Sequence, residues 1–361
     1  MSSQQQLQEQ LMLNARRHQM QMMAARQQLS TSSNNDTPLR QQMRPQSGTM
    51  GSKYDDLPIL NPADIIFIGE NPKSVGEVPA FFGSFESACQ HGPLSVIQSI
   101  VSPRNLTPAF LHHGLTRALR SGNVEVARYL LDSGAPIVRE TPSNIFFVPL
   151  EHQIALFELF TQHGWTPNTP GYYGRTLLPR TVKSLPLLRW FLDHGANPNL
   201  GAQRTSHDRR GGPDTSSCAA LEAAAVHGGV EAVRMILDAG ASIQNGVPLH
   251  YASGARPPGT NPHAGRVGPS QEFDTSRIPV MALLVERGAD VNQKEESRHM
   301  VLQYAIVYAV MAGAVERVKW LLEHGADPYI RGNWGSAAEY AHNSGNKEIT
   351  KVIEEFMKEN A

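Results

Sequence analysis

The sequence is poor in the features that mark secreted and membrane proteins. Among its 361 residues there are only two cysteines, Cys89 and Cys218. This excludes a disulfide framework and favours a reducing compartment. No apolar run approaches the roughly 20 residues of a membrane-spanning helix, and the N-terminus lacks the apolar core of a signal peptide. We therefore expect a soluble intracellular protein, cytoplasmic or nuclear, with no membrane partner.

A bias toward either charge is also lacking. Lys and Arg total 32 and Asp and Glu total 33, a formal net charge of −1, so we expect no direct nucleic-acid partner. Sequence motifs for phosphate-binding loops, dinucleotide folds, serine hydrolases and zinc sites are all absent. These absences predict a protein that is not an enzyme and has no catalytic, cofactor-binding or metal-binding residues and no cofactor.

The first 55 residues differ in composition from the rest of the chain. They hold seven of the twelve methionines and twelve glutamines, and they contain no Val, Ile, Phe or Trp. Such a segment cannot bury enough apolar surface to offset the entropy of ordering it. We expect residues 1–55 to be a disordered Gln/Met-rich tail, followed by a flanking segment at 56–81. Leu7, Leu11, Met22 and Leu29 have helical spacing, so a helix that forms on a partner is the alternative.

One phrase recurs along the rest of the chain. In "KWLLEHGADPY" (Lys319–Tyr329) an apolar run is followed by a short polar step, a glycine and a small residue. Each copy is expected to end a short amphipathic helix, with the glycine in the left-handed conformation that a side chain would disfavour. The glycines of the six copies are Gly134, Gly164, Gly195, Gly240, Gly288 and Gly325.

A helix–turn–helix pattern precedes the phrase. "GLTRALRSGNVEVARYLLDSGAP" reads as two short helices joined by a Ser-Gly-Asn turn, and similar segments follow at comparable spacing. Two short helices cannot form a core alone, so neighbouring units must stack. The last copy, "GSAAEYAHNSGNKEITKVIEEFMKEN", has a charged second helix, as expected of a terminal cap.

These motifs resemble the ankyrin repeat family. The segment "VPLHYA" (Val247–Ala252) is similar to the family's T-P-L-H-x-A opening, and "LLVERGADVN" and "LLEHGADPY" are similar to its helix ends. The resemblance implies an all-α solenoid of stacked helix-turn-helix units with β-hairpin-type finger loops, over residues 82–361, as seven repeats and a C-terminal capping repeat. It also implies that Pro248 begins a helix and that His250 is structural. The units that end at Gly164 and Gly195 depart from the opening motif.

Two inserted loops interrupt the repeats, at residues 201–217 and 253–277. Both are rich in Gly, Pro and polar residues, which predicts surface loops. The first falls where ankyrin repeats place a finger, and the second falls between the two helices of one unit. One interpretation is drift tolerated at the surface, because loop insertions cost little. The other is a basic finger that binds an acidic segment of a partner.

The resemblance implies a protein-interaction scaffold or adaptor that is a monomer outside its complex and binds a protein partner on the concave ankyrin surface. Arginines and aromatics carry most binding energy at such surfaces. The alternative is a regulatory or accessory subunit of a transcriptional or biosynthetic assembly, recruited through the Gln-rich tail. The candidate partner-binding residues, all in connections between units, are Arg204, Arg209, Arg210, Tyr172, Tyr173 and Trp334.

Overall fold

The computed structural model describes residues 53–68, 79–204, 208–260, 269–296, 301–333 and 335–360. The chain divides into two units, Met1–Gly51 and Ser52–Ala361. The predicted tail lies outside the described residues except for its last three positions, and all of the described residues belong to the second unit. These residues form helices, and the only β-type pairings among them are two isolated bridges. The all-α class is therefore confirmed.

Most of the helices come in consecutive pairs. The first helices of the pairs are α2 (Phe82–His91), α4 (Pro108–Ser121), α8 (Ala219–His227), α10 (Pro248–Ser253), α13 (Ala305–Ala312) and α15 (Ala337–Ser344). The second helices are α3 (Leu94–Val101), α5 (Val124–Asp132), α6 (Leu150–Gln162), α7 (Leu185–Asp193), α9 (Val230–Asp238), α12 (Ile278–Glu286), α14 (Val315–Glu323) and α16 (Lys347–Glu359). The remaining elements are α11 (Gln271–Ser276) and the 3₁₀ helices η2 (Pro62–Ile68), η4 (Thr141–Phe147), η5 (Tyr172–Gly174), η6 (Leu178–Arg180) and η7 (Ile243–Asn245).

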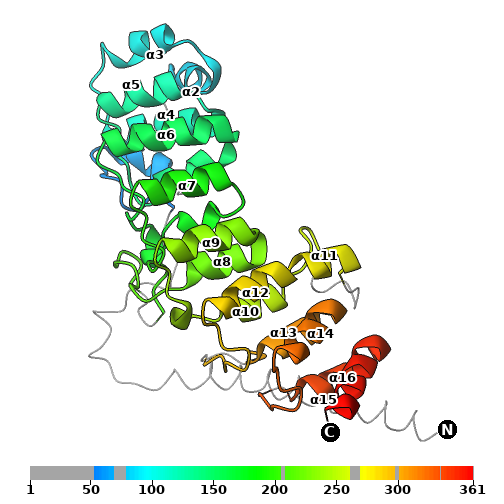
Figure 1. Cartoon of the computed structure of the whole chain (residues 1–361). Helices are drawn as coiled ribbons and strands as arrows, with labels where there is room; N and C mark the ends of the chain where they lie inside the picture. The colour runs from blue at the N-terminus through cyan, green and yellow to red at the C-terminus, as the bar shows by residue number, and fades with distance from the viewer. Residues whose placement is uncertain are drawn as a thin grey trace, which may run out of the picture. The chain divides into compact units, whose positions relative to one another are not determined.

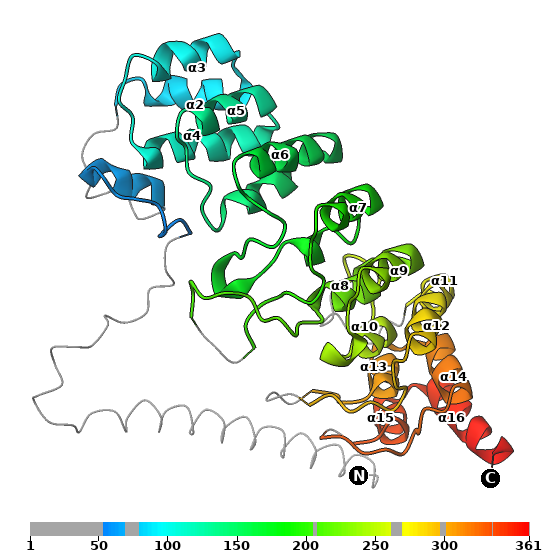
Figure 2. The ribbon, with the colours of Figure 1, turned by 60° about the vertical axis from the view of Figure 1, so that its left-hand side comes forward.

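The pairs stack in chain order (Figures 1 and 2). First helices contact the first helices of adjacent pairs, as α8 does with α10 and α10 with α13, while α5, α6 and α7 form a row of second helices. One cluster of buried apolar side chains runs through the unit from Phe67 to Ile353. The core is thus built between pairs, as stacked two-helix units require.

The two units that depart from the opening motif lack a full first helix. The 3₁₀ helices η4 and η6 stand in its place before α6 and α7. Large aromatic side chains pack there: the Phe157 ring centroid lies 5.3 Å from that of Trp165 and 4.9 Å from that of Phe191. These ring contacts join α6 to α7, so the stack continues through these units.

The repeated phrase ends each helix as expected. All six glycines have positive φ, between 79° and 99°. At the last copy, Ala326 N donates to Leu321 O at 2.9 Å and Gly325 N donates to Leu322 O at 3.0 Å. These two bonds define a Schellman cap, and they recur at the other five copies. A Cβ added at any of the six glycines would meet nothing within 4 Å, so only the backbone conformation demands glycine.

An asparagine four residues after the glycine joins adjacent units at three places. Asn292 Nδ2 donates to the carbonyl of Gly325 at 2.8 Å, and its Oδ1 accepts from Asp327 N at 2.9 Å. Asn168 and Asn199 make the same two bonds to the unit that follows each of them. The sequence analysis missed this bridge, although the asparagine is visible in "GWTPN", "GANPN" and "GADVN".

The "VPLHYA" opening has the expected local structure. Pro248 is the first residue of α10. The His250 side chain is fully buried, and its Nε2 lies 3.0 Å from the carbonyl oxygen of Gln303 in the next unit. Because a carbonyl only accepts, Nε2 carries the proton, and His250 links two units as the resemblance implied.

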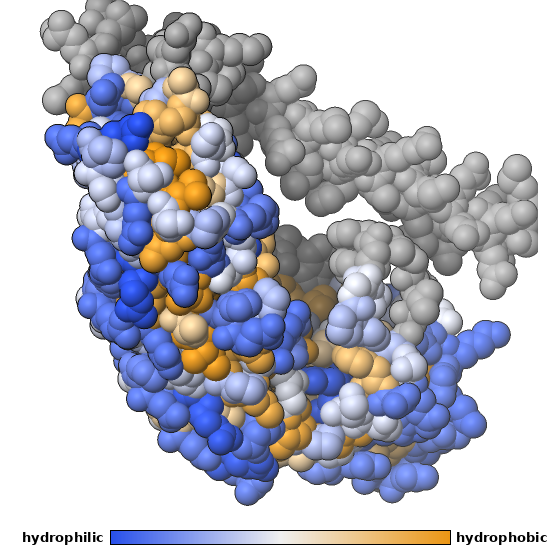
Figure 3. All heavy atoms as spheres, turned by 90° about the horizontal axis from the view of Figure 1, so that it is seen from above, coloured by the Kyte–Doolittle hydropathy of each residue, from blue (hydrophilic) through white to orange (hydrophobic). Residues whose placement is uncertain are grey.

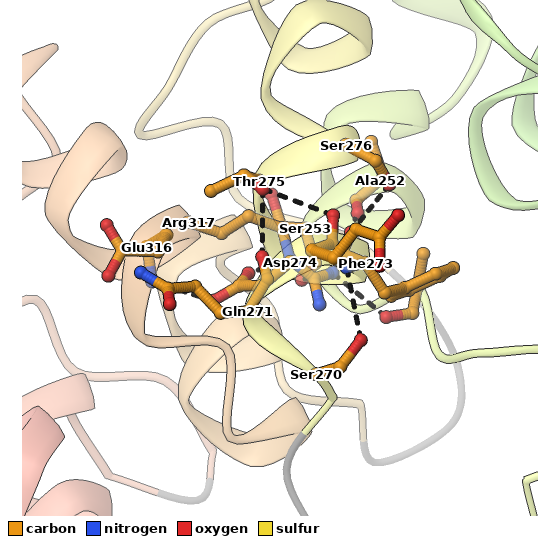
Figure 4. Close-up of polar contacts among 12 residues, drawn as sticks. Ala252, Ser253, Ser270, Gln271, Phe273, Asp274, Thr275, Ser276, Glu316 and Arg317 are labelled. Atoms are coloured by element: carbon orange, nitrogen blue, oxygen red, sulfur yellow. Dashed lines mark hydrogen bonds and ion pairs between the residues drawn. The ribbon is translucent and has the colours of Figure 1, made fainter.

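The predicted loop at 253–277 contains a short helix that is anchored to the stack. Asp274 on α11 accepts from Arg317 Nε at 2.7 Å, and both side chains are buried (Figure 4). Its other oxygen accepts from Glu316 N at 2.7 Å, at the start of α14. Arg317 also donates to the carbonyls of Ala252, Ser253 and Ala255, which follow or end α10.

The sequence analysis predicted surface loop throughout this insertion and so missed α11. Residues 261–268 within it lie outside the described residues. The signal for the rest was the capping serine of "SQEFD": Ser270 caps α11, its Oγ accepting from Phe273 N at 3.2 Å. The anchoring partner, Arg317, is 43 residues away and could not be paired with Asp274 from sequence alone.

Candidate protein-binding site

The long connection after α7 forms a finger. Gly201 and Asp214 exchange two backbone hydrogen bonds of 3.0 Å each, and Ser217 N donates to Asn199 O at 2.9 Å. A Cβ at Gly201 would lie 2.1 Å from Ser217 Oγ, so the close approach needs glycine there. The finger is therefore closed at its base by a single bridge, and its described residues form no longer β-hairpin.

The "PGYYGR" connection lies beside this finger, at Gln203 and Arg209. Tyr173 N donates to the Arg209 carbonyl at 2.8 Å, and Gln203 N donates to the Tyr173 carbonyl at 2.9 Å. Tyr173 has φ of 57°, which is unusual for a residue with a side chain. Tyr172 is buried and Tyr173 is 38% exposed. Backbone bonds thus bring together two loops that the sequence analysis selects independently.

Arg209 and Tyr172 clamp an acidic residue from the N-terminal flank. Arg209 Nε donates to Asp55 Oδ2 at 3.0 Å, and its guanidinium lies 3.7 Å from the centroid of the Tyr172 ring. The Tyr172 hydroxyl donates to Asp55 Oδ1 at 2.5 Å. Arg210 Nη2 donates to the Asp55 carbonyl at 2.7 Å. One carboxylate therefore contacts an arginine and a tyrosine at once, with a second arginine on its backbone.

The carboxylate of Asp56, the next residue, contacts both Arg139 and Tyr172. Asp56 Oδ2 accepts from Arg139 N at 2.9 Å, and Asp56 Oδ1 lies 3.0 Å from the Tyr172 hydroxyl. Arg139 in turn donates through Nη2 to the Arg210 carbonyl at 2.6 Å. Asp56, Arg139 and Trp165 are among the residues that line a cavity of about 300 Å³ beside this contact.

Tyr54 and Leu57 flank the two carboxylates and anchor the segment. The Tyr54 ring packs edge-on against the ring of His112, with centroids 4.8 Å apart. Asn144 Nδ2 lies 3.1 Å from the Tyr54 hydroxyl. Leu57 is 4% exposed. We call residues 54–57, Tyr-Asp-Asp-Leu, the acidic segment, and the group of Arg139, Tyr172, Arg209 and Arg210 the basic clamp.

The clamp shifts the pKa values of Asp55 and Tyr172 in opposite directions. Partial burial opposes ionisation of Asp55, but the hydrogen bond from Tyr172 and the contact with Arg209 outweigh it and lower the pKa of Asp55. Burial and the adjacent carboxylates of Asp55 and Asp56 raise the pKa of Tyr172. Asp55 is thus charged and Tyr172 is a neutral donor near pH 7.

The other predicted residues lie elsewhere. Arg204 donates to the Asn245 carbonyl, and its Nε lies 3.8 Å from Asp214 Oδ2. It therefore points toward the next unit and does not join the basic clamp. Trp334 lies outside the described residues. Of the six candidates, Tyr172, Tyr173, Arg209 and Arg210 come together.

Sequence reasoning missed Asp55, Asp56 and Arg139. Composition groups Tyr54 and Asp55 with the tail, yet both make the contacts described above. Two adjacent carboxylates beside an aromatic in "KYDDL" were the available signal. Their partners lie 83 to 155 residues away, a separation over which no local pattern predicts pairing.

The described residues include few groups suited to nucleophilic catalysis or metal binding. Cys89 and Cys218 are free and buried, and burial raises the pKa of each thiol to about 12, so neither is a thiolate near pH 7. Within the described ranges no group of three or more His, Cys, Asp or Glu side chains could hold a metal ion. In the same ranges, no helix combines the length and apolarity needed to span a membrane.

The helix pairs, their glycine caps and their contacts with adjacent pairs define a helical repeat protein. Comparison with family models identifies the repeat: the ankyrin repeat model matches residues 302–333, which include α13, α14 and the cap at Gly325. The chain is thus an ankyrin-repeat-containing protein. Searching the curated proteins produced no match.

Proposed function

We propose that the chain is a non-catalytic protein-interaction scaffold or adaptor, built as an ankyrin solenoid of seven repeats and a capping repeat. Ankyrin repeats are interaction modules, and a family match at residues 302–333 supports that class. Outside the matched residues, the five second helices α5, α6, α7, α9 and α12 end at the same glycine cap, which supports extending the repeat over them. Free, buried thiols support an intracellular location, cytoplasmic or nuclear.

The observation that carries the proposal is the convergence of Tyr172, Arg209 and Arg210. These residues come from two connections between units and meet on Asp55. Tyr172 and Arg209 contact its carboxylate, and Arg210 contacts its backbone carbonyl. Arginine and tyrosine are the residue types that dominate binding energy at protein interfaces. We assign partner binding to the face formed by the finger and the first helices. Figure 3, a view from above relative to Figure 1, shows apolar residues interspersed among polar ones on the surface that it presents.

The test compares partner capture by two charge-matched double variants of the full chain. Arg209→Ala with Arg210→Ala removes two cations from the finger, and Arg234→Ala with Arg287→Ala removes two from the region of the second helices, where they pair with Glu231 and Asp238. Capture of native-host proteins should fall at least tenfold for the first variant only. Equal capture by both variants would contradict the assigned face.

The same capture experiment distinguishes binding on the repeats from the alternative function, recruitment through the tail. Recruitment through the Gln-rich tail predicts that residues 52–361 capture no partner, whereas binding on the repeats predicts capture equal to that of the full chain. This alternative rests on the composition of residues 1–55.

A further inference from the structure

The acidic segment contacts the repeats as a separate peptide ligand would. The polar partners of the Asp55 side chain are 117 and 154 residues away in the chain. Each of the four consecutive residues has its own contact. The Tyr54 ring packs on His112, and the Asp55 carboxylate binds Arg209 and Tyr172. The Asp56 carboxylate accepts from the Arg139 backbone amide, and Leu57 is buried. Spaced side-chain anchors of this kind are how repeat proteins and other domains read short peptides.

The contact between the acidic segment and the basic clamp is partly exposed to solvent, so another ligand can replace the segment. The side chains of Arg209 and Asp55 are 25% and 24% exposed, and that of Arg210 is 57% exposed. Ion pairs that remain in contact with water hold weakly and are screened by salt. Water and competing carboxylates can therefore reach the clamp while the helix pairs around it stay packed.

The clamp has a defined chemical preference. Arg209 presents its guanidinium to the Asp55 carboxylate, and Tyr172 donates its one hydroxyl proton to the same group, with Asp56 Oδ1 3.0 Å from that hydroxyl. The Arg139 backbone amide donates to the Asp56 carboxylate. Neither a cation nor an apolar side chain at these two positions could accept hydrogen bonds from these donors. The neighbouring positions, against the His112 ring and at the buried site of Leu57, accept an aromatic and an apolar residue.

We propose that the basic clamp is a recognition site for a short acidic peptide of the pattern aromatic–Asp–Asp–apolar, and that the chain's own acidic segment is a tethered occupant that a partner's segment displaces. The inference rests on the proposed function, because it names the chemistry of the partner at that face and adds a regulatory step. The tethered segment suppresses weak ligands, since it competes at an effective concentration in the millimolar range.

The experiment measures binding of a labelled peptide of residues 51–60, GSKYDDLPIL, to the full-length chain by fluorescence anisotropy. Asp55→Asn with Asp56→Asn weakens the tethered occupant without changing the clamp. This variant should bind the peptide at least about tenfold more tightly than the wild-type chain does. Adding Arg209→Ala to it should abolish the gain, and a peptide with both aspartates replaced by asparagine should not bind. Affinity should fall as salt rises from about 50 to about 300 mM.

Peptide binding that is absent or no tighter in the Asp55→Asn, Asp56→Asn chain would overturn the inference and make the segment a permanent part of the fold. Circular dichroism checks that this chain is folded. Should it unfold, Asp55→Asn alone keeps the Asp56 contacts and allows the same comparison, with the same outcome overturning the inference.

The two proposals can fail separately. A chain that binds the peptide through Arg209 but captures no partner through the finger face would contradict the proposed function and keep the acidic-peptide site. A chain whose partner capture depends on Arg209 and Arg210, but which never binds the peptide, would contradict only this inference.

Discussion

His112 is a histidine whose charge the folded protein does not tolerate. Its side chain is 1% exposed, with Nε2 2.8 Å from Thr141 Oγ1 and the Tyr54 ring packed against it. Burial, with smaller repulsion from His113 and Lys53, lowers the pKa of His112 to about 3. The unfolded chain has no such environment, so its His112 titrates near the ordinary value of about 6.5.

The first prediction uses this difference. Between the two pKa values the unfolded state binds one more proton than the folded state, so the free energy of unfolding falls as pH falls from about 6.5 toward about 3. At pH 5 the loss due to His112 should be about 2 kcal/mol relative to pH 7. His112→Asn, which is uncharged at both values, should reduce the pH dependence of urea unfolding by that amount.

The matched control for this measurement is His342→Asn, at an exposed position of α15. It should leave the difference between pH 7 and pH 5 unchanged. Other buried histidines, among them His250, are present in both variants, so their contribution cancels in the comparison. An unaltered pH dependence in His112→Asn would show that this ring is not the acid-sensitive group.

At the same scale, residues with a local role were predictable and residues with a distant partner were not. The six cap glycines follow from the next few residues of their own helix, and their positive φ values confirm the prediction. His250 was assigned from a six-residue motif. The pairing of Asp55 with Arg209 depends on the path of the whole chain between them, so the sequence pointed to the arginine without its partner.

On the scale of elements, the same division appears in the inserted segments. The base of the finger forms between two residues 13 positions apart, Gly201 and Asp214. The position of the finger between units could be predicted from the longer interval between repeats. Helix α11 is six residues long and has almost no apolar pattern. It is held by the buried pair of Asp274 and Arg317, so its stability comes from tertiary contact rather than local propensity.

The second prediction concerns this pair. Asp274→Asn removes the negative charge from a buried arginine and weakens the acceptor for Glu316 N. Removing one partner of a buried ion pair costs about 3–5 kcal/mol because the other charge is left uncompensated. Urea unfolding should show a loss in that range, and amide exchange should accelerate in α11 and the first turn of α14.

Glu272→Gln is the control, since it makes the same charge change on the exposed side of α11 and should cost less than about 0.5 kcal/mol. Adding Arg317→Met to Asp274→Asn should restore part of the loss, because the unpaired buried charge is then gone. Full recovery is not expected, since Arg317 also donates to three carbonyls at the end of α10. Equal stability of Asp274→Asn and Glu272→Gln would contradict the anchoring role.

For the whole molecule, the boundary between the tail and the flanking segment at residue 55 stays a prediction from composition. The prediction ends the tail at residue 55, whereas the chain divides after Gly51 and contacts begin within the first residues of Ser52–Ala361. From its neighbours in the sequence alone, the first half of the acidic segment is predicted to belong to the tail. It becomes part of the second unit because arginines and a tyrosine from distant loops receive it.

The last prediction tests that boundary with two truncations of the chain. The fragment 52–361 keeps the contacts described above for the acidic segment, so its free energy of unfolding should match that of the full chain within about 0.5 kcal/mol. The fragment 58–361 loses the buried Leu57 and the hydrogen bonds to Asp55 and Asp56, and should be less stable by about 2–4 kcal/mol. Amide exchange should accelerate around Arg139 and Tyr173 in that fragment only. Equal stability of the two fragments would mean that the acidic segment adds nothing to the fold, and a loss already present in 52–361 would place stabilising contacts in residues 1–51.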